Sequence, residues 1–237
     1  MQKKQYRIHD ELENSYWWFL GKREYIKSYL PKPNKKFKIL DLGCGVGGTS
    51  LFLDNWGEVD RVEISPHAFP FLQKKKIKFR KGNIETVDFG RNKYDLICIL
   101  DVLYHKKIKD IGKILLKANT ALKKDGLILI MDCALPFLFS NHDKKMQAGR
   151  RFYLSILSKK LEQTNFLILK KSYIYFFLFP FFALNRLINK YVDFPTVNKI
   201  NRPLNYLLYK ICYFESLILK NVSLPIGSSV IILSQKI

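Results

Sequence analysis

Residues 39–50 read ILDLGCGVGGTS, an apolar run that ends in a turn rich in glycine. The run starts at Phe37, and its uninterrupted apolar character is typical of a buried parallel strand. Gly43, Gly45 and Gly47 allow the backbone to turn sharply on either side of Cys44 and to approach a ligand closely, beside the N-terminus of a helix. A nucleotide-like cofactor is the natural occupant of such a turn.

Strand and helix patterns alternate from this run as far as residue 132. Strands are expected over 37–42, 59–65, 77–83, 94–100 and 127–132, and helices over 49–56, 67–75 and 107–122. The KKDG sequence after the last of these helices is expected to end it. This order predicts an α/β fold, Rossmann-like and doubly wound.

The chain divides into four expected parts. They are an N-terminal helical cap over 1–36, a core over 37–172, an aromatic and basic helical insert over 173–222, and a last strand over 223–237 that completes the core sheet. The β-branched run near the C-terminus fits a strand, and a hairpin with the strand-like residues 166–173 is one way to place it.

Charge and cysteine usage indicate the kind of partner and compartment. The 41 Lys and Arg residues outnumber the 20 Asp and Glu residues, giving a formal net charge of +21. Such a chain seeks phosphates or acidic lipid headgroups, and charge alone does not say which. The four cysteines are widely spread without zinc-site spacing, and the N-terminus lacks the apolar stretch of a secretory signal. A reduced, cytoplasmic protein is expected.

Residues 173–184 form the longest uncharged aromatic segment, YIYFFLFPFFAL. A bilayer-spanning helix needs about 20 apolar residues, so spanning is disfavoured. An interfacial helix or a hydrophobic lid is the functional interpretation, and ordinary core packing is the alternative. If the segment is an interfacial helix, the protein is also expected to make peripheral contact with anionic lipid at the inner membrane face.

The glycine turn would suit either of two cofactors, and the carboxylates at the strand ends distinguish between them. Gly43, Gly45 and Gly48 also satisfy the GxGxxG spacing of NAD-binding proteins. Asp41, however, is placed to accept hydrogen bonds either from the turn or from a cofactor ammonium group, which S-adenosylmethionine (SAM) carries and NAD lacks. Glu63, next to Ile64, ends the second strand, where a carboxylate can bind both ribose hydroxyls.

Residues at the ends of the next two strands complete the expected donor site. Asn83 can bind the adenine amino group, with Ile84 supplying a backbone amide and an apolar face. Leu100 and Asp101 would line the methionine side of the cofactor. Tyr104 and His105 follow, and the two are expected to face the acceptor.

The motifs DLGCGxG, VExS, GNIE, YDLICxLDVLYH and LKKDGxLIL occur in this order and resemble the class I SAM-dependent methyltransferases over most of residues 37–132. This resemblance implies a seven-stranded sheet with helices on both faces, SAM over the carboxyl ends of the first two strands, and an antiparallel last strand. Where the family often has Glu before the His after strand four, this chain has Tyr104, so no metal is assigned. His105 would be the base if the acceptor is a hydroxyl.

Two further segments, ELENSYWWFLGKREYI over 11–26 and RPLNYLLYKICYFESLILKNVSLPIGSS over 202–229, resemble a type 11/12-like subgroup often found beside glycan or polysaccharide biosynthesis enzymes. That resemblance makes Trp17, Trp18 and Phe19 candidates for covering the cofactor, with Trp17 and Trp18 also candidates for the acceptor side. Packing of an N-terminal helix on the sheet is the alternative. The resemblance also places Lys22, with Arg23 beside it, where the subgroup usually has Arg, and Lys cannot make the bidentate carboxylate contact of Arg.

The expected activity is methyl transfer from SAM to a small-molecule, glycan or lipid-linked acceptor. An RNA or DNA acceptor is an alternative that rests on charge alone, because the paired prolines of base-amine methyltransferases and the Pro-Cys of cytosine enzymes are missing. An NAD-binding oxidoreductase, or a non-catalytic binding protein on the same fold, is a further alternative.

Overall fold

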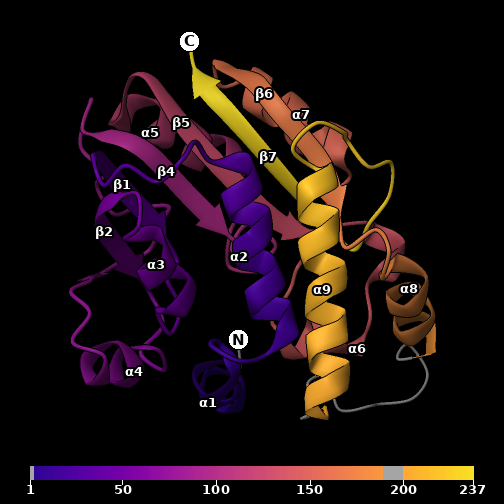
Figure 1. Cartoon of the computed structure of the whole chain (residues 1–237). Helices are drawn as coiled ribbons and strands as arrows, with labels where there is room; N and C mark the ends of the chain where they lie inside the picture. Colours follow the sequence, from indigo (N-terminus) through magenta and orange to yellow (C-terminus); the bar gives the residue numbers. More distant parts are fainter. Residues whose placement is uncertain (1–2, 189–199) are drawn as a thin grey trace.

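The computed structural model describes residues 3–188 and 200–237, which build one seven-stranded sheet flanked by helices (Figure 1). The strand order is β3-β2-β1-β4-β5-β7-β6. The strands are β1 (Phe37–Leu42), β2 (Gly57–Glu63), β3 (Arg80–Lys81), β4 (Tyr94–Leu100), β5 (Leu122–Cys133), β6 (Phe166–Ile174) and β7 (Ser229–Lys236). β1 to β5 are parallel, whereas β7 runs antiparallel between β5 and β6. The predicted fold, including the antiparallel last strand, is confirmed.

Helices cover both faces of the sheet. They are α1 (Lys3–Leu12), α2 (Trp17–Tyr29), α3 (Gly48–Leu53), α4 (Phe69–Lys74), α5 (Ile111–Ala121), a 3₁₀ turn η1 (Pro136–Leu138), α6 (Asn141–Lys145), α7 (Leu154–Glu162), α8 (Phe179–Ile188) and α9 (Arg202–Ile218). α5 and α7 bury their apolar sides on one face of the sheet, and α2 and α9 on the other. Successive side chains of a strand point to opposite faces of the sheet. Ile39 therefore packs in the core that α2 and α9 cover, and Leu40 packs in the core that α5 and α7 cover.

Some element ends differ from the sequence expectation. α5 starts at Ile111, four residues later than expected, because the Asp110 side chain accepts a hydrogen bond from the Lys113 amide and caps the helix there. The KKDG sequence does follow the helix end, but it forms an irregularity inside β5 rather than a loop before it. β3 keeps only two paired residues, at an exposed edge of the sheet.

The aromatic segment 173–184 serves two roles in the fold. Tyr173 and Ile174 extend β6 two residues beyond the expected end of the core, and Tyr175 and Leu178 are buried beside α2. Phe181 and Leu184, by contrast, are exposed on α8. Within residues 3–188 and 200–237, no helix has both the length and the apolar character that crossing a membrane requires.

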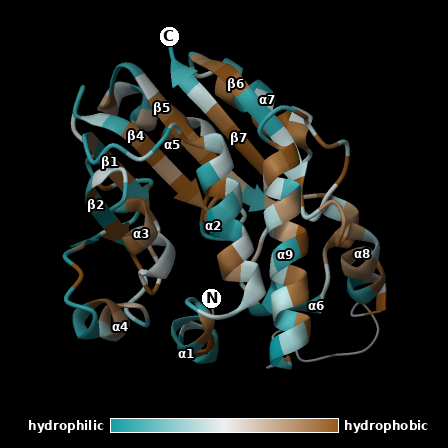
Figure 2. Cartoon of the chain, in the orientation of Figure 1, coloured by the Kyte–Doolittle hydropathy of each residue, from teal (hydrophilic) through white to brown (hydrophobic). Residues whose placement is uncertain are grey.

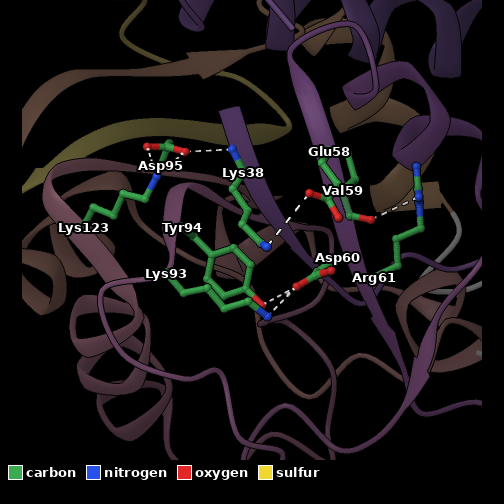
Figure 3. Close-up of polar contacts among 9 residues, drawn as sticks. All are labelled: Lys38, Glu58, Val59, Asp60, Arg61, Lys93, Tyr94, Asp95 and Lys123. Atoms are coloured by element: carbon green, nitrogen blue, oxygen red, sulfur yellow. Dashed lines mark hydrogen bonds and ion pairs between the residues drawn. The ribbon is translucent and has the colours of Figure 1, made fainter. Parts of the chain in front are cut away.

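A group of ion pairs lies toward the amino-terminal side of β1, β2 and β4 (Figure 3). Asp95 accepts hydrogen bonds from the Lys38 amide and from the Lys123 ammonium, and Asp60 binds Lys93 and the Tyr94 hydroxyl. Exposed pairs of this kind contribute little free energy each. They connect neighbouring strands at the side of the sheet away from the glycine turn.

Candidate active site

The glycine turn connects β1 to α3 in a conformation that ordinary residues avoid. Gly43, Gly45 and Gly47 have φ angles of +85°, +59° and +100°. The amides of Gly43 and Cys44 donate to the Val62 carbonyl, which holds the turn against β2. A Cβ added at Gly45 would meet no atom within 4 Å, so the turn has an open side there.

Glu63 joins the end of β2 to this turn. One carboxylate oxygen accepts a hydrogen bond of 2.8 Å from the Gly45 amide, and the other accepts from the amides of Ile64 and Ser65 at 2.9 and 2.7 Å. Burial raises the pKa of Glu63, and the three amides oppose that rise. The neighbouring Ile64 side chain is 51% exposed, an apolar surface beside a buried carboxylate.

Asp41 is the second buried carboxylate at this edge of the sheet. Burial raises its pKa to about 6, although a hydrogen bond with Ser50 and the charges of Lys22 and Arg61 act in the opposite direction. A cationic ligand beside Asp41 would further favour the ionised form. Cys44 is also buried, and burial raises the pKa of its thiol, so it contributes backbone and packing rather than a thiolate.

Asn83 and Ile84 form the turn after β3. The Asn83 side-chain oxygen accepts a hydrogen bond from the Glu85 amide, and the Ile84 side chain is buried in the core. The Lys117 ammonium binds the Ile84 carbonyl at 3.0 Å. In this structure both residues therefore stabilise the turn itself.

The end of β4 meets the N-terminal cap. Asp101 has a φ angle of +59°, a strained value for a residue other than glycine and one that is common at functional sites. Its carboxylate pairs at 2.6 Å with the ammonium of Lys22 on α2, which also lies 5.6 Å from the centre of the Trp18 ring. Leu100, just before Asp101, is buried in the core that α2 covers.

Tyr104 and His105 face structural neighbours in the loop after β4. The Tyr104 ring is buried in the core, where burial raises the pKa of the phenol well above its usual value, and the Tyr104 amide donates to Asp132. His105 Nδ1 accepts a hydrogen bond from the Lys107 amide at 3.2 Å. Burial lowers the pKa of His105 to about 4, so its neutral imidazole is a weak base.

The remaining candidates lie in the cap. Trp17 packs edge-on against Tyr175, and the Trp18 ring stacks on the same tyrosine with 6.4 Å between ring centres. The Arg23 guanidinium binds the Glu13 carbonyl and the Asn14 side chain. Arg23 thus stabilises the α1–α2 turn, whereas its neighbour Lys22 reaches the end of β4.

Four groups near these residues carried no signal in the sequence: buried Asp132 and half-buried His9, His142 and Arg186. Burial lowers the pKa of His9 to about 4 and that of His142 to about 3, and it raises the pKa of Asp132 to about 8. Arg186 of α8 pairs with Asp143 at 3.1 Å. His9, His142 and Arg186 lie on α1, α6 and α8. These three helices lie at the end of the sheet toward which β4 and β5 point (Figure 1). The four groups come from separate elements, so no local motif marks them.

Comparison with known proteins gives the family. A methyltransferase-domain family matches residues 18–163, more than half of the chain. The chain belongs to this methyltransferase family. The match decides between the two cofactors that the glycine turn would suit, and SAM is the cofactor of this methyltransferase.

Relatives and solved structures agree with this assignment. The phosphoethanolamine N-methyltransferase of Plasmodium falciparum is 29% identical over 109 residues, which cover 43% of this chain and 41% of that protein's length. A SAM-dependent methyltransferase from Archaeoglobus fulgidus has a TM-score of 0.61 at 14% identity, over 98% of this chain and 99% of the other. Phosphoethanolamine N-methyltransferase 2 of Haemonchus contortus, solved with SAM, has a TM-score of 0.58 at 20% identity, over 90% of this chain and 51% of the other. These structural similarities show the fold.

The N-terminal cap of the methyltransferase is attached directly to the glycine turn. Glu13 accepts a hydrogen bond of 2.8 Å from the Gly48 amide and also binds the Lys75 ammonium. Lys75 in turn pairs with Asp10 at 2.6 Å and donates to the Val46 carbonyl at 2.8 Å. One buried carboxylate therefore connects α1, the glycine turn and the residues after α4.

Glu13→Ala is expected to lower the free energy of unfolding by about 1.5–3 kcal/mol, because it removes charge-assisted hydrogen bonds from a buried position. Urea denaturation would measure the change. Glu11→Ala is the matched control, since Glu11 forms an exposed pair with Arg7 on α1 and should change stability by less than about 0.5 kcal/mol. Equal effects of the two variants would show that the Glu13 contacts do not stabilise the cap.

Proposed function

We propose that this methyltransferase transfers the methyl group of SAM to a small-molecule acceptor that carries an anionic group. The observation that carries the proposal is the pairing of one carboxylate, Asp143, with two arginines, Arg151 and Arg186, which leaves an excess of positive charge for an anionic acceptor to compensate. The curated relative supports a small-molecule acceptor, because its name specifies phosphoethanolamine as the substrate.

The donor site is formed by the ends of β1, β2 and β4. Glu63 would bind the ribose hydroxyls, with Ile64 offering an apolar surface to the adenine, and Asp41 would face the positively charged part of the donor. The open side of Gly45 leaves room for a ligand to approach the backbone. SAM supplies an activated methyl group, and the side chains named here orient it and keep the site dry.

On the proposed acceptor side, two arginines pair with a single carboxylate, so positive charge exceeds negative charge. Asp143 pairs with both Arg151 and Arg186, at 2.9 and 3.1 Å, so that two guanidinium groups share one carboxylate. Burial lowers the pKa of Arg186 to about 10, which leaves it charged at neutral pH. An anionic group on the acceptor would compensate the excess charge.

Electrostatic contacts connect this arginine pair to the end of β4. Arg186 and His9 act electrostatically on His142, and the Lys22 and Asp101 charges act on His9. The two histidines are uncharged near pH 7 because burial lowers both pKa values. We propose that they line the acceptor space between Arg186 and Asp101, and that Asp101 accepts a hydrogen bond from the nucleophile.

Arg186→Gln should raise the acceptor KM by about 10- to 100-fold, the equivalent of one charge-assisted hydrogen bond, while the Kd for SAM stays unchanged. Arg151 still pairs with Asp143 in this variant, so the fold should persist. Initial rates with varied acceptor and calorimetry with SAM give the two constants. Arg91→Gln, at an exposed loop position, is the control.

Screening metabolites with methyl-labelled SAM identifies the acceptor. The proposal expects labelled products from acceptors bearing phosphate or carboxylate and at least tenfold weaker labelling of their neutral analogues. Labelling of RNA or DNA in preference to every small molecule would instead support the nucleic-acid alternative. Turnover of neutral acceptors at the same rate would contradict the role of Arg186.

A further inference from the structure

The outward side of α9 is unusually apolar for a surface helix. Six large side chains on this side are exposed: Leu204, Tyr206, Leu207, Tyr213, Phe214 and Leu217. Phe214 and Tyr206 are 57% and 60% exposed. The opposite side of α9 packs on α2 and contributes Cys212 to the core, so the exposed side chains are not required for that packing.

The apolar surface continues onto the segment after β6, which leads into α8. Phe177 contacts Phe214, with 6.0 Å between ring centres, and Phe181 and Leu184 on α8 are 68% and 59% exposed. α8 begins two residues after Phe177, and Figure 2 shows hydrophobic residues on both α8 and α9. We refer to these exposed residues, Phe177, Phe181, Leu184 and the six of α9, as the α8–α9 face.

The exposed charged residues of α9 and of the turn that follows it are all basic. Lys210 projects from the middle of α9, with its ammonium 5.2 and 5.5 Å from the ring centres of Tyr206 and Tyr213, and Arg202 and Lys220 are exposed near the two ends of the helix. Glu215 is the only acidic residue of α9, and its buried carboxylate accepts a hydrogen bond from the Phe177 amide. Glu24, the carboxylate of α2, accepts a hydrogen bond from the Tyr209 hydroxyl.

We propose that the α8–α9 face binds the surface of an anionic phospholipid membrane. Exposed Phe, Leu and Tyr side chains with lysines beside them suit insertion at the boundary between headgroups and acyl chains, where the lysines meet lipid phosphates. The formal net charge of +21 draws the whole chain toward such a surface. The membrane holds the protein in this proposal and need not supply its acceptor.

A second copy of the chain fits the face less well. It would bring the same lysines and the same net positive charge toward the contact, with no exposed carboxylate on α9 to compensate them. An anionic membrane supplies both the apolar layer and the negative charge. Charge complementarity therefore favours the membrane over self-association.

Vesicle flotation with the full chain tests the proposal. The protein should float with vesicles containing phosphatidylglycerol at least tenfold better than with phosphatidylcholine alone, and 0.5 M salt should weaken the binding. Leu207→Ser/Phe214→Ser should reduce flotation at least tenfold, and Lys210→Gln/Lys220→Gln should reduce its salt dependence. Leu116→Ser/Ile156→Ser is the matched control, because these residues are equally exposed on α5 and α7, which cover the other face of the sheet.

Several results would overturn the proposal. They are a wild-type protein that does not float, equal flotation with both vesicle types, or an equal loss in the α5/α7 control. A dimer that light scattering detects in the wild type and not in Leu207→Ser/Phe214→Ser would assign the face to a second copy. Circular dichroism and SAM binding confirm that each variant is folded, and Phe181→Ser provides an independent variant of the face.

Discussion

Glu63→Ala is expected to bind SAM at least about a hundredfold more weakly than the wild-type chain. Hydrogen bonds to a charged group contribute about 1.5–3 kcal/mol each, and two of them to ribose hydroxyls account for this factor or more. The same substitution removes the acceptor for the amides of Gly45, Ile64 and Ser65, so the glycine turn also loses its attachment to β2. Isothermal titration calorimetry with SAM measures the change.

Glu58→Ala is the matched control for that measurement. Glu58 lies on the same strand, and its exposed carboxylate forms a long, 3.9 Å pair with Lys38 at the other end of β2 (Figure 3). Its SAM affinity should equal that of the wild type. An unchanged affinity of Glu63→Ala would place the ribose elsewhere, and equal losses in both variants would indicate general destabilisation of β2.

Lys22→Met is expected to lower the free energy of unfolding by about 3 kcal/mol and to reduce kcat by at least tenfold. The Lys22 and Asp101 side chains are 7% and 18% exposed, and removing one partner of such a pair leaves the other charge buried and uncompensated. Asp101 also depends on this contact for its position beside the proposed acceptor space. Urea denaturation gives the stability, and steady-state kinetics gives kcat.

Two further variants separate stability from catalysis in this prediction. Lys22→Met/Asp101→Asn removes both charges, so it should recover most of the stability while its kcat stays low. Lys22→Arg introduces the residue expected at this position from the subgroup resemblance, and it should retain the ion pair. A double variant with wild-type kcat would show that the pair only stabilises the fold.

Local patterns were sufficient for the core of the fold. The apolar run from Phe37 to Leu42 and its glycines specify a buried strand and a tight turn through residue types alone, and β4 was predicted with its observed ends. The start of α5 was not, although Asp110 is a recognisable helix cap, because the apolar pattern of the helix extends past it. The family followed from motifs that are each short and occur in a known order.

Local patterns were less informative about the chemistry of single side chains. Tyr104 and Asn83 occupy expected positions at strand ends, but the Tyr104 ring is in the core and the Asn83 side chain binds its own turn. Whether a side chain at a strand end turns toward a ligand or toward the core depends on neighbours from other elements. The roles given to His105 and to the tryptophans of the cap stay predictions for the same reason.

The turn from Gly43 to Gly48, the alternation of strands and helices, and the SAM methyltransferase family can be determined without coordinates, because each depends on residues adjacent in the chain. The residue pairs that hold the N-terminal cap against the site cannot be determined without coordinates. Lys22 and Asp101 are 79 residues apart, and Glu13 and Gly48 are 35 apart. Such contacts, and the exposed apolar side of α9, exist only once the helices have packed on the sheet, since packing decides which side chains are buried and which charges meet.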